Sequence, residues 1–317
     1  MDVITIGESM ILFTPTTNGL MRYKSEFLAT IAGAESNVSI GLSRLGHKVC
    51  WISRLGNDEF GKKILTYLRG EGVDVSQVIL DPVNQTGLYF KEIITGDEIR
   101  VHYYRKNSAA SWMKPTDINE AYFTKAKYLH ITGITPALSE ICYQTTMEAI
   151  EIAKKNGVKV VFDPNIRRKL WSDVQAKRVL MEISGKSDII LPSLEEGKFL
   201  TNETSPEKIA NYFYNIGISI VVVKLGEKGA YYHTKDEKRY VPPFPVKQVI
   251  DPVGAGDGFA AGFISGLLDD LTLFKAVERA AAIGSLVTMV EGDVEGLPDR
   301  DQLNRFINKS DKEDVYR

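Results

Sequence analysis

Residues 251–263 place small residues and an aspartate at the point where an apolar helix is expected to begin. The N–H groups of a helix's first turn have no partner within the helix, and the helix dipole adds partial positive charge there. The small residues Gly254, Ala255 and Gly256 let this backbone approach an anion closely, which predicts a cradle for a phosphoryl group. Asp257 would repel a phosphate that was merely held. We therefore interpret it as a base that takes the proton of a hydroxyl attacking the phosphorus.

The same motif also has a plainer interpretation. A glycine-rich turn with Asp257 as a favourable charge in the first turn of a helix requires no chemistry. For an isolated Gly-Ala-Gly-Asp this is the commoner case, so the rest of the chain has to decide between the two.

Three further segments carry binding residue types at the ends of predicted strands, where open α/β sheets place their ligands. Residues 221–230 end in a Gly-x-x-Gly turn, which lays backbone along a nucleotide or simply closes a hairpin. In residues 163–171, Arg167 directly follows a buried strand and an Asp-Pro-Asn turn. Glu195 and Glu196 follow another strand. They either favour a helix N-terminus or hold, through water, a Mg²⁺ ion that keeps several waters.

Tyr89, Tyr103 and Arg105 lie on predicted strands in a fourth region. Alternation along a strand puts Tyr103 and Arg105 on the same face. Arginine recognises a carboxylate by a two-pronged hydrogen bond, while tyrosine adds an aromatic wall and a hydroxyl. Aromatic-rich strands are more often simply well packed. The combination of Arg105 with Arg167 from another region is what favours an acidic sugar as the substrate.

Strands and helices alternate along the chain and must position these residues. Strands are predicted at residues 3–7, 48–53, 128–132, 158–162, 188–191 and 218–224, and helices at residues 35–45, 58–69 and 138–155. The continuous β-branched run at 158–162 is typical of a strand covered on both faces. The crossovers predict an α/β fold with a doubly wound, mostly parallel sheet.

Residues 77–104 break this rhythm, because they predict strands at 78–80, 86–95 and 99–104 with little helix. We expect a small antiparallel β lid, formed mainly by about residues 10–30 and 77–106, beside the active site. An edge hairpin or a dimer surface is the alternative, and one element can serve both roles. No repeat or linker is evident, so residues 1–317 are predicted to form a single catalytic domain with this lid.

Composition excludes several classes of protein. The 317 residues are 44% hydrophobic and 25% charged, as in ordinary globular proteins, and 39 basic against 41 acidic residues give no general attraction for nucleic acid or membrane surfaces. No apolar run approaches the roughly 20 residues that span a bilayer, and the start lacks the basic region of a signal peptide. Cys50 and Cys142 are predicted to be core residues, and the four histidines form no zinc motif. We expect a cytoplasmic enzyme without a nucleic-acid or membrane partner.

The whole chain resembles the ribokinase-type (PfkB) sugar kinases. Residues 251–259, Asp-Pro-Val-Gly-Ala-Gly-Asp-Gly-Phe, match the family's C-terminal signature D-x-x-G-A-G-D-x-F. The N-terminal signature region is present at residues 33–38 and 54–61. The resemblance implies a ribokinase-like fold, Asp257 as the base, and the amides of residues 254–257 as the anion hole.

The resemblance also implies ATP and Mg²⁺ as cofactors, with a monovalent cation as a further candidate. The implied ATP-binding residues are Asn165, Ser193, Lys224, Gly226, Glu227, Gly229, Gly254 and Gly256. Glu196, through water, and Asp251 are implied at the metal. The sequence departs from the family's N-x-x-E motif, since Ser193 stands in the asparagine position while Glu196 keeps the acidic one.

Within the family the chain is most similar to 2-keto-3-deoxygluconate kinases, through residues 7–8, 103–105 and 163–171. This implies transfer of phosphate to the 6-hydroxyl of 2-keto-3-deoxygluconate, giving 2-keto-3-deoxy-6-phosphogluconate. The implied substrate-binding residues are Gly33, Ala34, Asn37, Tyr89, Tyr103, Arg105, Arg167 and Asp293. A homo-oligomer, dimeric or larger, through the lid is also implied. A kinase for fructose, another ketose or a nucleoside, and a sugar-binding sensor without catalysis, stay open as alternatives, as does the choice between gluconate and galactonate derivatives.

Overall fold

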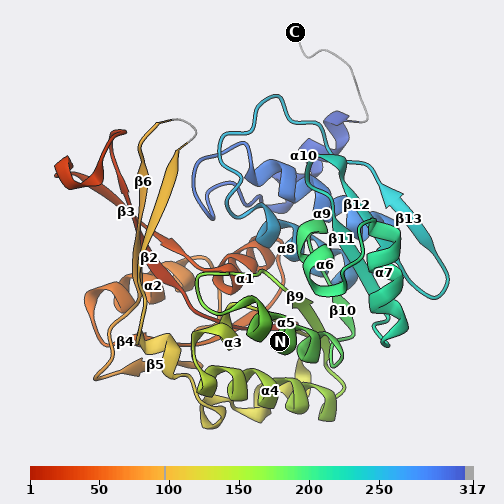
Figure 1. Ribbon diagram of the computed structural model, residues 1–317, viewed down its shortest axis with the longest axis horizontal. Coiled ribbons are helices and arrows are strands. Elements are labelled where there is room, and N and C mark those ends of the chain that lie inside the picture. The colour runs from red at the N-terminus through yellow and green to blue at the C-terminus, as the bar shows by residue number, and fades with distance from the viewer. Residues whose placement is uncertain (96–97, 311–317) are drawn as a thin grey trace.

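The computed structural model describes residues 1–95 and 98–310. Its main sheet contains β1 (Val3–Ile6), β4 (Val49–Gly56), β5 (Val78–Asp81), β8 (Tyr128–Thr132), β9 (Lys159–Asp163), β10 (Ile189–Ile190), β11 (Ile220–Lys224), β12 (Ala230–His233) and β13 (Lys238–Val241). The nine strands lie in the order β13-β12-β11-β10-β9-β8-β1-β4-β5 (Figure 1). The strands from β11 to β5 are parallel, and β12 and β13 extend one edge in antiparallel fashion. The predicted doubly wound, mostly parallel sheet is confirmed.

Helices cover both faces of this sheet. One face packs against α1 (Ala34–Arg44), α2 (Glu59–Gly70), α8 (Ala255–Leu268) and α9 (Leu273–Val287), and the other against α4 (Glu140–Lys155), α5 (Asp173–Ser184), α6 (Leu194–Thr201) and α7 (Pro206–Asn215). Neighbouring side chains on one strand therefore enter different cores: Val160 and Phe162 pack on the α4 side and Val161 on the α8 side. Burial on both faces explains why these strands are continuously apolar.

Shorter elements complete the chain. They are α3 (Thr135–Leu138), α10 (Arg300–Ser310) and the 3₁₀ turns η1 (Met21–Tyr23), η2 (Ala109–Trp112), η3 (Pro115–Asp117), η4 (Glu120–Lys125) and η5 (Gly226–Lys228). The single helix predicted at 138–155 is interrupted at Ser139, whose backbone is extended and whose Oγ accepts a hydrogen bond from the N–H of Cys142. Cys50 and Cys142 are buried and unpaired, as predicted. Across residues 1–95 and 98–310, no helix is both long and apolar enough to cross a membrane.

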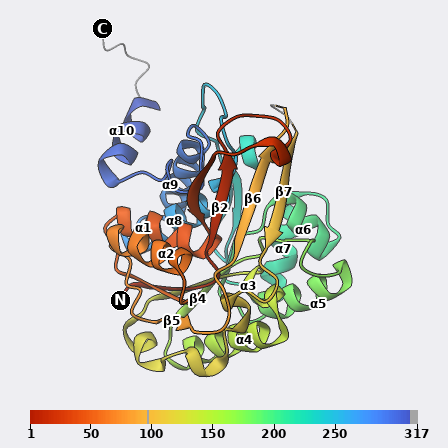
Figure 2. The ribbon, with the colours of Figure 1, turned by 90° about the vertical axis from the view of Figure 1, so that its left-hand side faces the viewer.

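A second sheet of four strands stands beside the main one (Figure 2). It consists of β2 (Met10–Pro15), β3 (Phe27–Ala32), β6 (Leu88–Ile93) and β7 (Ile99–Tyr104) in the order β3-β2-β6-β7. Its outer pairs are antiparallel, whereas β2 and β6 are parallel, because each follows a main-sheet strand running in the same direction. The sequence places residues 78–80 in the lid. In the structure they belong to β5, because the free edge of β4 pairs with them in parallel.

The two sheets meet at the carboxyl ends of the main strands. From β1 the chain proceeds to β4 and β5 on one side and then returns to β8 on the other. Open α/β sheets bind ligands at such a reversal of strand order. The second sheet presents a face containing Met10, Leu12 and Tyr89 next to this reversal, while its other face, with Ile11 and Ile31, packs toward α2.

Candidate active site

The first turn of α8 forms the centre of the site. Gly254 caps this helix with a positive φ of 78°, and a Cβ there would lie 2.5 Å from the carbonyl oxygen of Asp293, so only glycine fits. The N–H groups of Ala255, Gly256 and Asp257 lie in the turn that has no partners within the helix, and that of Ala255 donates to the carbonyl oxygen of Pro252 at 3.4 Å. Gly256 is exposed, so this turn is open to a ligand. The turn thus has the helix N-terminal geometry that the predicted amide cradle requires, and its binding of a phosphoryl group stays a prediction.

Asp257 is held in place by α1. The Asn37 Nδ2 donates to its Oδ2 at 2.8 Å, across 220 residues of sequence. Burial raises the pKa of Asp257, while Asn37 and the positive charges of Arg167 and Lys224 lower it. The carboxylate is therefore fixed beside the amide cradle in an environment that favours proton uptake, which is what a base requires.

Two predicted ligand residues, Asp293 and Lys224, lie next to this turn. Asp293 is 8% exposed, and burial together with the charges of Asp257 and Asp251 raises its pKa to about 7. The Lys224 Nζ lies 3.8 Å from the position that a Cβ on Gly256 would occupy. A positive charge thus stands directly beside the predicted phosphate cradle.

Lys224 is itself held by a buried partner. Its Nζ donates to the Asp163 Oδ2 at 2.6 Å, joining the carboxyl ends of β11 and β9 across β10. Burial alone would lower the pKa of Lys224, but the charges of Asp163, Glu196 and Asp257 raise it. Lys224 therefore stays protonated, and its charge is available to phosphate oxygens.

Glu196 performs the plainer of its two predicted roles. The Ser193 Oγ caps α6 by accepting from the N–H of Glu196 at 3.3 Å, while the Glu196 Oε2 accepts from the N–H and Oγ of Ser193, each at 2.8 Å. This reciprocal capping box explains how serine serves in the position of the family's asparagine. The Glu196 Oε1 also accepts from the N–H of Ile166 at 2.9 Å, so it fixes the segment that carries Asn165 and Arg167.

The structure suits Glu196 better than Asp251 as a residue near a metal ion. No group of three or more His, Cys, Asp or Glu residues within the described ranges forms a cage for a metal ion. The Glu196 carboxylate has the oxygen donors that suit a water-bound Mg²⁺. The Asp251 Oδ2 instead accepts from the Lys91 Nζ at 2.7 Å, and this ammonium group opposes a second cation at the same oxygen. Contact between Asp251 and the metal stays a prediction.

The predicted sugar-binding residues gather on the second sheet and the loop after β9. The rings of Tyr89 and Tyr103 are 5.3 Å apart, and the Arg105 guanidinium lies 5.5 Å from the Tyr103 ring. Arg167 is exposed in the loop after β9, and its positive charge lowers the pKa of both Asp257 and Tyr89. The positive charges of Arg105 and Arg167 both lower the pKa of Tyr89, so both act on this aromatic wall.

Sequence reasoning missed the partner of Arg105. Its Nη2 donates to the Oε2 of buried Glu8, whose Oε1 accepts from the Ser108 Oγ at 2.5 Å. The Arg105 Nε is buried without a hydrogen-bond partner within the described residues. Glu8 at the end of the first strand is noticed only through the family resemblance, and no local pattern joins it to a residue 97 positions away.

Glu35 was also missed, although it lies within the N-terminal signature. It is fully buried at the reversal between β1 and β8, where its Oε1 accepts from the Thr132 Oγ1 at 2.7 Å and the Thr135 Oγ1 at 3.0 Å. Its Oε2 has no partner, and a Cβ on Gly7 would lie 2.1 Å from that oxygen. Burial raises the pKa of Glu35 to about 7. A glutamate in a first helical turn is usually solvated, so sequence gives no signal of this burial.

The raised pKa of Glu35 predicts a pH-dependent stability. Its pKa rises from 4.5 to about 7 on folding, so the folded chain binds the extra proton, and the free energy of unfolding falls as pH rises through this window. Glu35→Gln has no proton to lose. Between pH 5 and pH 8 its free energy of unfolding should fall by about 1–3 kcal/mol less than that of the wild type, measured by urea unfolding. Glu59→Gln, in the exposed first turn of α2, should keep the wild-type slope, and an unchanged slope in Glu35→Gln would contradict the assignment.

The remaining predicted residues occupy loops around this cluster. Gly33 precedes α1, where a Cβ would lie 2.4 Å from the Glu8 carbonyl oxygen, and Ala34 follows it. The turn with Gly226, Glu227 and Gly229 closes the hairpin between β11 and β12, as one of the two interpretations of this segment holds. Its contact with ATP stays a prediction.

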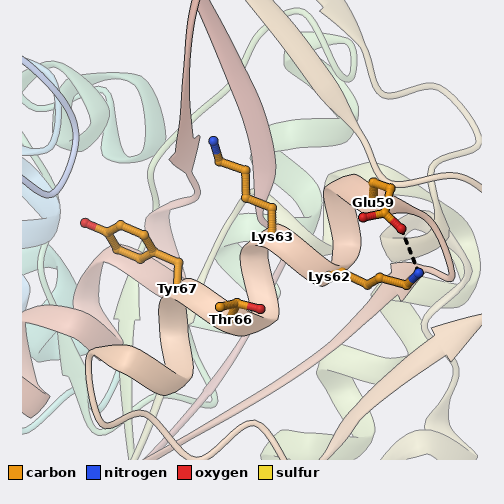
Figure 3. Close-up of a pocket in the computed structure, with 5 residues that line it drawn as sticks. All are labelled: Glu59, Lys62, Lys63, Thr66 and Tyr67. Atoms are coloured by element: carbon orange, nitrogen blue, oxygen red, sulfur yellow. Dashed lines mark hydrogen bonds and ion pairs between the residues drawn. The ribbon is translucent and has the colours of Figure 1, made fainter.

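A shallow surface groove elsewhere contains none of these residues. It lies along α2 and is lined by Glu59, Lys62, Lys63, Thr66 and Tyr67 (Figure 3). All five come from one exposed helix, so the groove lacks the convergence of strand ends and helix N-terminus that marks the candidate site.

Comparison with known proteins agrees with this geometry. The sequence model of the pfkB family carbohydrate kinases matches residues 1–300. The chain belongs to this family. It is 43% identical over 311 residues to the 2-dehydro-3-deoxygluconokinase of Bacillus subtilis (strain 168), which covers 97% of this chain and 96% of that protein.

Solved structures of PfkB kinases share the fold. A PfkB protein from Polaromonas sp. JS666 has a TM-score of 0.89 at 42% identity, with 96% of this chain and 99% of that chain covered. A fructokinase from Vibrio cholerae O395, with fructose, ADP and calcium ion bound, has a TM-score of 0.86 at 30% identity, with 96% and 99% covered. The predicted family and fold class are confirmed.

Proposed function

We propose that this PfkB kinase transfers the γ-phosphoryl group of ATP to the 6-hydroxyl of 2-keto-3-deoxygluconate. The observation that carries the substrate is a pair of arginines near the aromatic wall: the Arg105 guanidinium lies over the Tyr103 ring, and Arg167 is exposed in the loop after β9, with both charges lowering the pKa of Tyr89. Two guanidinium groups suit the carboxylate of a sugar acid. The 43% identity to a 2-dehydro-3-deoxygluconokinase supports the same substrate, because 2-dehydro-3-deoxygluconate is another name for 2-keto-3-deoxygluconate.

The proposed sugar site lies between the second sheet and the main sheet. Tyr89 and Tyr103 form its aromatic wall, Gly33 and Ala34 its backbone edge, and Asn37 and Asp293 approach the reacting end. The four-stranded sheet acts as the lid of one catalytic domain, and its closure excludes water that would otherwise hydrolyse ATP. With the carboxylate held near the arginines, the far end of the sugar points toward Asp257.

Transfer proceeds at the first turn of α8. Asp257 accepts the proton of the sugar hydroxyl while its oxygen forms a bond to the γ-phosphorus, and the bond to the β-phosphate oxygen breaks to release ADP. The amides of residues 254–256 and the Lys224 ammonium stabilise negative charge on the transferring group. The hairpin turn at 226–229, with Asn165 and Ser193, lines the nucleotide.

Mg²⁺ would neutralise charge on the ATP phosphates, and Glu196 would hold it through water. Bound ADP and calcium ion in the Vibrio cholerae fructokinase agree with use of a nucleotide and a divalent cation. A monovalent cation near residues 249–250 and 282–289 stays a prediction.

Use of ATP agrees with a cytoplasmic location. Association of copies through the second sheet, where Leu28 on one face and Tyr104 on the other are exposed, is part of the same proposal.

An ADP-release assay with a panel of acceptors tests this function. We expect kcat/KM for 2-keto-3-deoxygluconate to exceed that for fructose, ribose and adenosine by at least about 10²-fold, because only the sugar acid engages both arginines. Its galactonate epimer tests the stereochemistry of one hydroxyl. Reactions without acceptor measure background ATP hydrolysis.

Two results would contradict the proposal. Fructose or adenosine as the best acceptor would assign another kinase activity on the same fold, which the fructokinase relative makes a concrete alternative. Binding of sugar acids by calorimetry without ADP release from any acceptor would indicate a non-catalytic sensor.

A further inference from the structure

Lys91 of β6 forms an ion pair with Asp251, the first residue of the glycine-rich motif. The Lys91 Nζ and Asp251 Oδ2 are 2.7 Å apart, and the two side chains are only 12% and 6% exposed. Exposed pairs such as Lys62–Glu59 contribute little to stability. The attraction within a shielded pair is offset by the cost of removing both charges from water, so stability alone does not explain why the pair is there. This pair connects the second sheet to the loop before α8.

Asp251 determines the course of that loop. Its Oδ1 accepts from the N–H of Val253 at 3.1 Å, and its own N–H, like that of Ile250, donates to the carbonyl oxygen of Thr288. The loop is thus attached to the end of α9 through its backbone and to β6 through Lys91. Gly254 lies three residues after Asp251, directly behind the Val253 that Asp251 holds, so a displaced Asp251 would displace the amide cradle and Asp257.

Lys91 also shares a strand face with Tyr89. Residues two apart on a strand point to the same side, so both face the candidate site. The charge of Asp293 raises the pKa of Tyr89, and the charge of Lys91 lowers the pKa of Asp293. β6 therefore carries both Tyr89 of the proposed aromatic wall and Lys91, which pairs with Asp251 in the loop before α8.

We propose that Lys91 is a positioning residue for phosphoryl transfer. By holding Asp251, it aligns the amide cradle and Asp257 with the sugar bound against Tyr89 on the same strand. The identity of that sugar rests on the proposed function, whereas the alignment itself does not. Misplacement of reacting groups by about 1 Å can cost on the order of 10²-fold in rate, so loss of the pair should appear in turnover.

Kinetics of Lys91→Ala test this role. We expect kcat to fall by about 10–100-fold, with KM for the acceptor within about 3-fold of the wild type, because the sugar contacts remain. Lys91→Arg should retain most of the activity. Ethylammonium ion should restore much of the kcat of Lys91→Ala by entering the space beside Asp251, whereas tetramethylammonium at equal ionic strength should not. Lys62→Ala, which removes an exposed lysine ion pair, is the matched control.

A wild-type kcat in Lys91→Ala would overturn the proposal. So would a loss that neither ethylammonium nor Lys91→Arg reverses, because the pair would then serve folding alone. The acceptor is whichever one the wild type phosphorylates best, so failure of 2-keto-3-deoxygluconate as substrate is seen separately in the wild-type panel. Lys91→Met, which keeps the apolar stem, should show the same fall in kcat but no rescue by ethylammonium, and it replaces Lys91→Ala where that variant does not fold.

Hydrogen exchange provides a measurement that needs no acceptor. In the wild type, the amides of residues 250–258 should exchange more slowly than in Lys91→Ala or Lys91→Met, because the pair restrains this loop. Amides of α4, which packs on the opposite face of the main sheet, should exchange equally in all variants. Equal exchange in residues 250–258 would show that Lys91 does not position the loop.

Discussion

Replacing Asp257 with asparagine is expected to lower turnover by about 10²–10⁴-fold while binding of the sugar persists. The substitution keeps the size of the side chain and removes the group that accepts the hydroxyl proton. The Asn37 Nδ2 can still donate to the new amide oxygen as it does to the Asp257 Oδ2 at 2.8 Å, so the first turn of α8 should keep its geometry. Turnover is measured by ADP release and sugar binding by calorimetry.

The chain offers a matched control for this experiment. Asp173 is likewise an acidic residue in a first helical turn, that of α5, but it is exposed and pairs only loosely with Arg168 at 3.7 Å. Asp173→Asn should leave turnover unchanged. Near-normal turnover in Asp257→Asn would mean that Asp257 is merely a favourable charge at a helix terminus, the plainer interpretation of the motif.

The pH profile adds an independent readout for the base. Only the deprotonated carboxylate of Asp257 accepts a proton, so kcat/KM should fall as pH drops through its pKa. Burial raises that pKa, which moves the acid limb above the range of an ordinary aspartate. Asp257→Asn should lose this limb, whereas Asp173→Asn should retain it.

Local sequence patterns predicted most of the main-sheet strands, because the burial of a strand on one or both faces is visible in its own run of residues. The continuous β-branched run at 158–162 predicts a two-sided strand, and β9 is buried on both faces. The strand at 128–132 has the predicted bounds. Residues 78–80 were assigned to the lid because strand propensity does not say which edge a strand will join. The free edge of β4 decides it.

The sequence predicted which residues belong to the site, but not which residues hold them by hydrogen bonds and ion pairs. Motifs identified Asp257, Arg105 and Asp251, yet the groups that hold them lie far away in sequence: Asn37 at 220 positions, Glu8 at 97 and Lys91 at 160. Such pairs form only where two elements meet in the fold. The structure therefore adds these long-range partners to the site. They hold the first turn of α8 and the strands of the second sheet in fixed positions relative to their neighbours.

The second large effect is expected in the discrimination between acidic and neutral sugars. Arg167→Ala and Arg105→Lys should each lower kcat/KM for 2-keto-3-deoxygluconate about 10–100-fold more than kcat/KM for fructose, because a charge-assisted hydrogen bond contributes about 1.5–3 kcal/mol. The ratio of the two substrates is the measure. Loss of Arg167 also removes a charge that lowers the pKa of Asp257, and this effect is common to both acceptors.

Lysine, rather than alanine, is the informative replacement for Arg105. Arg105→Ala would leave Glu8 buried and unpaired at a cost of about 3–5 kcal/mol, so its low activity would report unfolding as much as recognition. Lysine keeps a positive charge for Glu8 and removes the planar guanidinium with its buried Nε. Arg168→Ala, which removes the exposed neighbour of Arg167, is the control. Equal losses for 2-keto-3-deoxygluconate and fructose in both variants would reject a carboxylate clamp and leave the arginines a structural role around a neutral sugar.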